Sequence, residues 1–174
     1  MRSFFSLSLL WVVAVCFPPA VAAQALSDTS SADVSISVLV PAKVKISQIQ
    51  DVTLDSWSGA GDLESSQQIS VWSSTGSYTI AMTTTEGTNG FGMLGPSGKE
   101  LEYSVLWDSG SGFQSVVSGQ SYAGLPTSSN SVNCNTGDDS ANRPSLKVSV
   151  AEKDLNKAKA GQYSDVLQIL IATQ

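Results

Sequence analysis

The chain has 174 residues and a net charge of −6, with nine Lys and Arg against fifteen Asp and Glu, and it contains no His. The acidic balance argues against binding to nucleic acid, whose phosphates it would repel. The absence of His excludes Ser-His-Asp and Cys-His catalysis as usually built, and it excludes His-ligated zinc. The length fits one domain with a sizeable core.

The N-terminus has the three regions of a secretory signal peptide. Arg2 supplies a positive charge, residues 4–17 form an apolar run, and two prolines then lead into small residues. The run is shorter than the roughly 20 residues that span a bilayer. We therefore expect an exported protein whose mature chain does not insert into a membrane; a retained anchor and a lipid attached at Cys16 are less favoured alternatives. Cleavage is expected after Ala22, Ala23 or Ala25.

The first strand pattern begins at Asp33. Four apolar side chains recur at every second position, which is typical of a strand with one buried face: Val34, Ile36, Val38 and Val40. Pro41 interrupts the pattern, because proline cannot donate to a strand ladder. Residues 43–47 predict a second strand, and residues 52–54 a third, short one.

Further alternation predicts strands over residues 68–73, 78–83, 101–107, 113–117, 146–150 and 163–172. Residues 58–62, 74–76 and 86–99 are expected to be mostly loop or turn, residues 120–144 a long polar connection, and Leu155 the centre of a helical turn. About seven to nine short strands with almost no helix indicate an all-β fold, an antiparallel β-sandwich.

Several of these segments resemble the spore coat protein U-like domain family, which includes the pilins of archaic (Csu-type) chaperone–usher pili. The similarity lies in residues 101–107, 146–150 and 160–169, the last containing a Gly-x-Tyr-x-Asp element at Gly161, Tyr163 and Asp165. Residues 69–71 and 76–82 resemble an earlier element of the family. Family members usually have a disulfide that links the first strand to the strand before the Gly-x-x-Tyr turn, and this chain has no Cys at either place.

The resemblance implies an immunoglobulin-like sandwich that lacks its final strand. In such a fold a periplasmic chaperone first covers the exposed groove, and the N-terminal strand of a neighbouring subunit then replaces it at an outer-membrane usher. The implied donor strand carries Val34, Ile36, Val38 and Val40, and the implied edge of the acceptor groove carries Leu167, Ile169 and Ile171. An ordinary first strand paired within its own chain is the alternative for residues 33–40.

The expected organisation is a signal peptide at 1–25, an N-terminal extension with the donor strand at 26–42, and a β-sandwich at 43–174. The expected function is a structural subunit of a pilus or surface fibre, which passes through the periplasm to the cell surface. The alternative is a secreted, self-contained β-sandwich that binds glycan or protein, for which the exposed aromatic candidates are Trp57, Trp72, Trp107, Phe113 and Tyr122.

No catalytic residue, cofactor or metal ligand is assigned. The carboxylate pairs Glu100/Glu102 and Asp138/Asp139 are more simply solvated surface charges than glycosidase groups. Calcium binding by Asn133, Asn135 and the second pair lacks a known ligand spacing. Removal of the signal peptide with Cys16 leaves Cys134 as an unpaired thiol, free or joined to another molecule.

Overall fold

The computed structural model describes residues 29, 31–129, 131–134 and 143–174. The chain divides into residues 1–39 and residues 40–174. In the first part, residues 31–39 form no helix or strand, and their side chains are exposed. The expected signal peptide and its cleavage sites lie outside the described residues.

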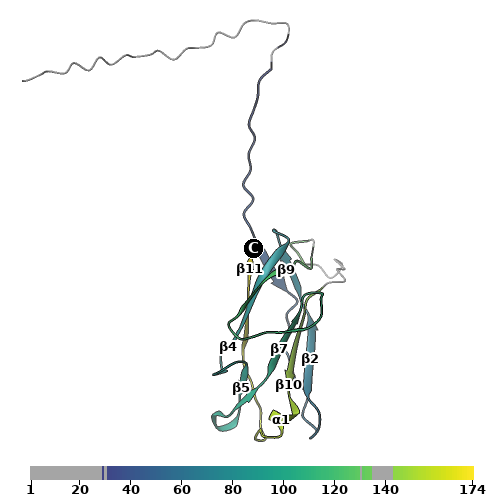
Figure 1. The fold of residues 1–174 in the computed structure, drawn as a ribbon, viewed down its shortest axis with the longest axis vertical. Coiled ribbons are helices and arrows are strands. Elements are labelled where there is room, and N and C mark those ends of the chain that lie inside the picture. Colours follow the sequence, from purple (N-terminus) through teal and green to yellow (C-terminus); the bar gives the residue numbers. More distant parts are fainter. Residues whose placement is uncertain (1–28, 30, 130, 135–142) are drawn as a thin grey trace, which may run out of the picture. The chain divides into compact units, whose positions relative to one another are not determined.

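Residues 40–174 are built almost entirely from short strands (Figure 1). In chain order the elements are β1 (Val44–Ser47), β2 (Leu63–Gln68), β3 (Ser70–Ser73), β4 (Ser77–Thr84), β5 (Gly92–Leu94), the 3-10 turn η1 (Pro96–Gly98), β6 (Glu100–Glu102), β7 (Ser104–Asp108), β8 (Gln114–Ser115), β9 (Ser121–Pro126), β10 (Ser145–Val150), α1 (Glu152–Leu155) and β11 (Leu167–Thr173). The strand pairings described are all antiparallel, so the prediction of an all-β, antiparallel fold is confirmed.

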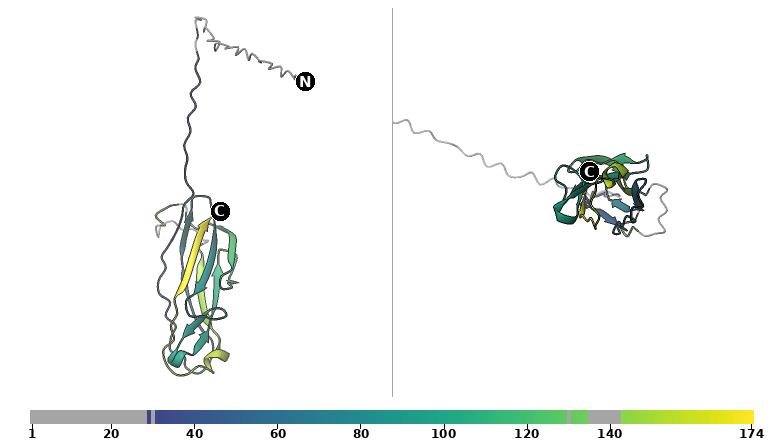
Figure 2. Two further views of the ribbon diagram at one scale, coloured as in Figure 1. Left: turned by 90° about the vertical axis from the view of Figure 1, so that its left-hand side faces the viewer. Right: turned by 90° about the horizontal axis from the view of Figure 1, so that it is seen from below.

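Two larger sheets form the body of this unit. One has the strand order β2-β10-β7-β8 and the other β11-β4-β9, while β1 pairs with β3 and β5 with β6. Figure 2 shows the strands of both sheets running along the long direction of the unit. β3 follows β2 after a single residue, Ile69, so one extended stretch contributes first to the β10 sheet and then to the pair with β1.

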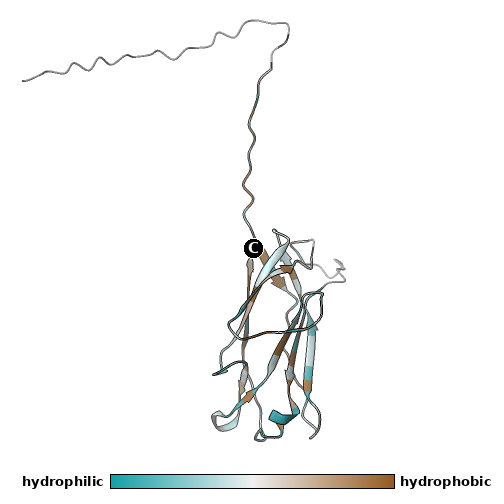
Figure 3. Ribbon diagram, in the orientation of Figure 1, coloured by the Kyte–Doolittle hydropathy of each residue, from teal (hydrophilic) through white to brown (hydrophobic). Residues whose placement is uncertain are grey.

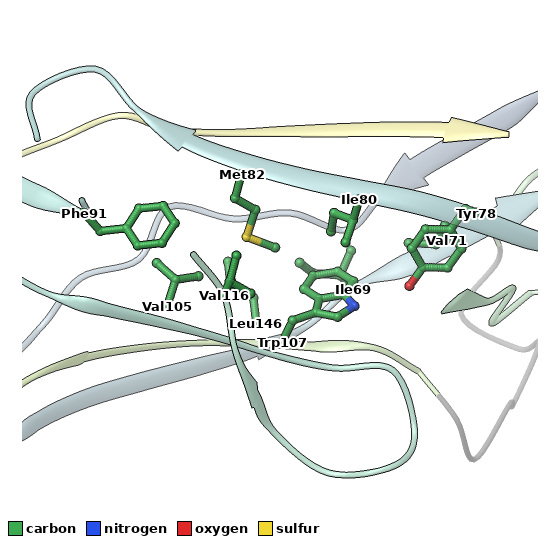
Figure 4. Packing of buried hydrophobic residues seen from close by; sticks show 10 residues of the cluster. All are labelled: Ile69, Val71, Tyr78, Ile80, Met82, Phe91, Val105, Trp107, Val116 and Leu146. Atoms are coloured by element: carbon green, nitrogen blue, oxygen red, sulfur yellow. The ribbon is translucent and has the colours of Figure 1, made fainter. Parts of the chain in front are cut away.

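The main core lies between the two sheets. Tyr78, Ile80 and Met82 of β4 meet Val105 and Trp107 of β7 there (Figure 4). The inward side chains occupy every second position, as the sequence alternation predicted for both strands. Figure 3 shows the apolar residues concentrated along the strands that enclose this core.

A second, smaller cluster lies beside α1. Leu101, Val150 and Leu155 are its buried members, and Trp57 and Tyr163 pack against them. α1 is the helical turn expected around Leu155, whose side chain is its buried residue. This cluster fills the space between the β10 sheet and the segment that leads into β11.

Several strand predictions were wrong. Residues 52–54 form no strand, because they have no backbone partner in the described part of the chain. Residues 33–40 form no strand within the described chain either, and their pairing with a second copy stays a prediction. β9 lies in the stretch expected to be a long polar connection, and β2 has a polar sequence, LESSQQ, that gives no hydrophobic alternation. β11 begins at Leu167 rather than at Tyr163, because the residues before it are held by side-chain contacts described below.

Candidate functional site

β11 lies at the edge of its sheet. It pairs with β4 over its whole length, from Leu167 opposite Thr84 to Thr173 opposite Tyr78. Its other edge has no strand partner among the described residues. An unpaired edge presents a row of N–H and C=O groups that can template another strand. β11 has seven residues, of which every second one directs its backbone groups to this edge, and β1 also lies near β11.

A cleft of about 1120 Å³ runs beside β11, and we call it the β11 cleft. Residues 49–57 form one wall and residues 158–167 with Ile169 the other. Its floor is mainly apolar and comes from β2 and β10 of the opposite sheet and from the β5–β6 hairpin with the residue after it: Leu63, Leu146, Val148, Val150, Met93, Leu101 and Tyr103. The cleft therefore combines an open strand edge with apolar surface, the two features that a complementary strand needs.

The wall formed by residues 49–57 has no backbone–backbone hydrogen bond in the described structure. It is attached instead by side chains. Gln67 of β2 accepts a hydrogen bond from the N–H of Gln50 and donates one to its carbonyl, both at 2.8 Å. At the far end the Trp57 indole N–H donates to the carbonyl of Gly61 at 2.9 Å.

Asp165 fixes the segment that leads into β11. Its Oδ2 accepts hydrogen bonds from the hydroxyls of Tyr103, at 2.6 Å, and Thr84. Its Oδ1 accepts from the N–H of Glu86 at 3.1 Å and from the Thr85 hydroxyl at 3.2 Å. One carboxylate thus joins the floor of the cleft, the end of β4 and the start of the β11 segment.

This arrangement shifts the pKa values of both acidic groups. Partial burial by itself would raise the pKa of Asp165, but the hydrogen bonds from Thr84, Tyr103 and Glu86 outweigh it and hold the pKa below its ordinary value. Burial and the hydrogen bond to the Asp165 carboxylate raise the pKa of Tyr103. Asp165 is therefore charged and Tyr103 protonated at neutral pH.

The Gly-x-Tyr-x-Asp element has a steric role as well. Gly161 has a φ of 150°, and a Cβ there would overlap Pro96 of η1. The ring of Tyr163 lies where a Cβ on Gly95 would be, and its hydroxyl donates to the carbonyl of Lys159 at 3.0 Å. The backbone of Leu94 exchanges two hydrogen bonds with that of Ser164. The element packs the β5–β6 hairpin against the segment before β11.

The structure places the sequence-predicted site residues as follows. Leu167, Ile169 and Ile171 all pack against the main core, and Leu167 and Ile169 also line the β11 cleft. The apolar side chains expected to form the donor strand are between 75% and 93% exposed: Val34, Ile36, Val38 and Val40. Cys134 is buried and has no disulfide in the structure, and its carbonyl accepts a hydrogen bond from Gln48.

The other candidate residues take different positions. Trp107 is buried in the main core and Trp57 packs in the smaller cluster, which leaves Phe113, at 44% exposed, as the more accessible aromatic ring. Glu100 is exposed and accepts hydrogen bonds from the backbone and hydroxyl of Thr88. Asp138, Asp139 and Asn135 lie outside the described residues. Within the described ranges, no cluster of three or more His, Cys, Asp or Glu residues is arranged to hold a metal ion.

Two contributors to the site were not found from the sequence. Gln67 lies in a strand without hydrophobic alternation, so its inward orientation had no signal. Tyr103 was predicted to lie in a strand, but its hydrogen bond to Asp165, 62 residues away, was not predicted.

In the described part of the chain, no helix has the length and apolar character required to cross a membrane.

The chain is similar in structure to several solved chains. No family model and no curated protein matches the chain. One of the solved structures belongs to work described as "Chaperone-tip adhesin complex is vital for synergistic activation of CFA/I fimbriae biogenesis"; it is 18% identical, with a TM-score of 0.47. The match covers 75% of this chain and 41% of that one, so this chain spans less than half the length of the chain it matches.

Proposed function

We propose that this protein is a structural subunit of a pilus or surface fibre, joined to its neighbours by strand exchange. The observation that carries the proposal is the open edge of β11 beside an apolar cleft. The same chain holds an exposed, alternating apolar segment at residues 34–40, equal in length to the seven residues of β11. The occupant we propose for the β11 cleft is this segment from a second copy of the chain.

The driving force is burial of apolar surface together with pairing of a strand edge. Burying an exposed Val or Ile side chain contributes about 1.5–3 kcal/mol. Val34, Ile36, Val38 and Val40 are positioned by their alternation to enter the cleft on one face of a strand, with Ser35 and Ser37 on the other. Backbone pairing with β11 then satisfies the open edge.

The proposal includes partners that protect the cleft before assembly. An open strand edge and an exposed apolar cleft both favour aggregation in water. A periplasmic chaperone would cover them after export, and an outer-membrane usher would accompany the exchange for a neighbouring subunit, as the resemblance to chaperone–usher pilins implies. The final location is then the cell surface, and the protein acts as a building block rather than as an enzyme.

Removal of the donor segment tests the proposal. A variant that lacks residues 26–40 is compared with the chain that begins at residue 26, by light scattering after gel filtration. The variant is expected to bind a labelled peptide of residues 31–42 but not to polymerise, because it keeps the acceptor and loses the donor. Normal polymerisation of the variant would overturn the donor assignment. If the longer chain is a stable monomer and does not bind the peptide, the self-contained, ligand-binding module is favoured instead.

A further inference from the structure

The strongest remaining feature is the pair of hydrogen bonds between the Gln67 side chain and the Gln50 backbone. The side-chain amide accepts from the N–H of Gln50 and donates to its C=O, each at 2.8 Å. This is the donor and acceptor pattern that a neighbouring strand offers to one residue of an antiparallel pair. Gln67 therefore satisfies one residue of the 49–57 wall as a strand would.

The rest of the wall has backbone groups that are not paired with another strand. Residues 49–57 make no backbone–backbone hydrogen bond, and the chain from residue 48 to residue 58 contains no turn or bend. In an extended chain, successive residues direct their N–H and C=O groups to opposite edges. Gln48, just before this stretch, has a positive φ of 64°. If the wall is extended from Ile49 onward, the backbone groups of Ile49 and Asp51 would be directed to the edge opposite Gln67.

The β11 cleft is bounded by this wall on one side and, on the other, by residues 158–166 together with Leu167 and Ile169 of β11. We propose that Gln67 is a positioning residue, which holds residues 49–57 as a second pairing edge so that an entering strand is hydrogen-bonded on both sides. This inference rests on the proposed function and deepens it: the entering strand is residues 34–40 of a second copy. Pairing on both sides leaves no new open edge, whereas pairing with β11 alone would create one.

Gln67 is held in place by the pairing of β2 with β10. It lies in β2, where its Cα partner on β10 is Leu146, and both residues line the cleft. The neighbouring Gln68 is exposed and its side chain makes no hydrogen bond in the described structure. Gln68→Ala is therefore a matched control, with the same change of side chain one position along the strand.

The test uses the chain that begins at residue 26, at a concentration where it is monomeric, and a labelled peptide of residues 31–42. Gln67→Ala is expected to weaken peptide binding about tenfold, since two hydrogen bonds of ordinary net strength no longer position the wall. Gln67→Glu keeps the acceptor and loses the donor, so an intermediate loss is expected. Gln68→Ala is expected to bind as the unchanged protein does.

Hydrogen exchange supplies a readout that a merely structural role would not produce. In the unchanged protein the peptide is expected to protect the amides of β11 and of residues 49–57, and in Gln67→Ala those of β11 alone. Protection of β11 alone in the unchanged protein would overturn pairing on both sides. Equal affinity and equal protection in Gln67→Ala would overturn the role of Gln67, while the proposed function would stand.

The failure of the proposed function gives a different result, because the unchanged protein would then not bind the peptide at all. Thermal unfolding of each variant separates loss of binding from loss of fold. If Gln67→Ala does not fold, the exchange pattern of the unchanged protein and the affinity of Gln67→Glu decide the question.

Discussion

The hydroxyl of Tyr103 donates a 2.6 Å hydrogen bond to the Oδ2 oxygen of Asp165, and so ties the floor of the β11 cleft to the segment that begins β11. Thr84 donates to the same oxygen from the end of β4. The contact therefore holds the residues just before β11 against the floor of the cleft. Tyr103 and Asp165 are 62 residues apart in the sequence, and the fold brings them into contact.

Asp165→Asn tests this contact through stability. Hydrogen bonds to a charged group contribute about 1.5–3 kcal/mol each, and the amide cannot accept all the bonds that the carboxylate accepts. We expect the free energy of unfolding at pH 7 to fall by about 1–3 kcal/mol. Denaturant unfolding measures it, with Tyr103→Phe as the variant that removes one bond of the set. An unchanged midpoint in both variants would contradict the structural role of the contact.

The lowered pKa of Asp165 also predicts a pH dependence. Because the folded pKa of Asp165 lies below its ordinary value of 3.8, the carboxylate stabilises the fold fully above that pH, and the contribution is lost as pH falls through the folded pKa. The unchanged protein should therefore lose stability on acidification below about pH 4 more steeply than Asp165→Asn does. Unfolding curves at a series of pH values measure this dependence. If the free energy of unfolding falls with pH at the same rate in both proteins, Asp165 does not cause the effect.

Gly161→Ala tests the packing of the Gly-x-Tyr-x-Asp element. The new Cβ would overlap Pro96, and the φ of 150° is unfavourable for any residue with a Cβ. We expect the free energy of unfolding to fall by about 1–3 kcal/mol. Gly90→Ala is the matched control, because a Cβ there meets nothing within 4 Å. Equal stability of the two variants would contradict the packing described for η1 and the β11 segment.

Tyr78 offers a prediction of the opposite sign. Its side chain is fully buried in the main core, and its hydroxyl makes no hydrogen bond of good geometry. Burial raises the pKa of Tyr78 to about 12, and the nearby indole N–H of Trp107, which also lacks a well-formed hydrogen bond, opposes that rise. Removing a buried, unpaired hydroxyl relieves a desolvation cost. Tyr78→Phe should therefore raise the free energy of unfolding by about 1 kcal/mol. Calorimetry compares it with Tyr103→Phe, which loses a hydrogen bond, and destabilisation of both would show that the Tyr78 hydroxyl is satisfied.

The core was predictable from the sequence because its strands bury one face each. β4, β7 and β10 alternate apolar and polar residues, and the structure buries the apolar set of each. β2 was not predictable, since its half-buried positions Ser65 and Gln67 are polar, and Gln67 lines the cleft rather than a packed core. In the wall at residues 49–57 the sequence predicted only a short strand at 52–54. That prediction was wrong, because the wall is held by two side chains and not by a strand ladder.

The alternation at residues 34–40 predicts a strand, but it does not identify the strand's partner. The four apolar side chains are exposed and their segment forms no strand in the described structure, so pairing with another copy stays a prediction. Likewise, the sequence placed Leu167, Ile169 and Ile171 on one face of a strand, and nothing in it indicated that all three pack against the main core while Leu167 and Ile169 also line the cleft. Partner choice depends on distant parts of the chain.

Ile36→Asp tests the apolar face of the proposed donor strand. Its side chain is 93% exposed, so the substitution should leave the unfolding free energy of residues 40–174 unchanged. A charge on the face that enters the cleft should abolish polymerisation. Ser37→Asp places the same charge on the opposite face and should polymerise more nearly as the unchanged chain does. Light scattering measures both, and equal loss in the two variants would contradict insertion by this face.

Photo-cross-linking between copies tests strand exchange most directly. A photoreactive phenylalanine analogue replaces Ser37, and ¹⁴N-labelled and ¹⁵N-labelled copies of the chain from residue 26 are mixed, assembled and irradiated. Mass spectrometry then identifies the peptides joined to residue 37. Strand exchange predicts links to β11 or to residues 49–57 that combine a ¹⁴N peptide with a ¹⁵N peptide. Links confined to one isotope, or to neither wall of the β11 cleft, would contradict it.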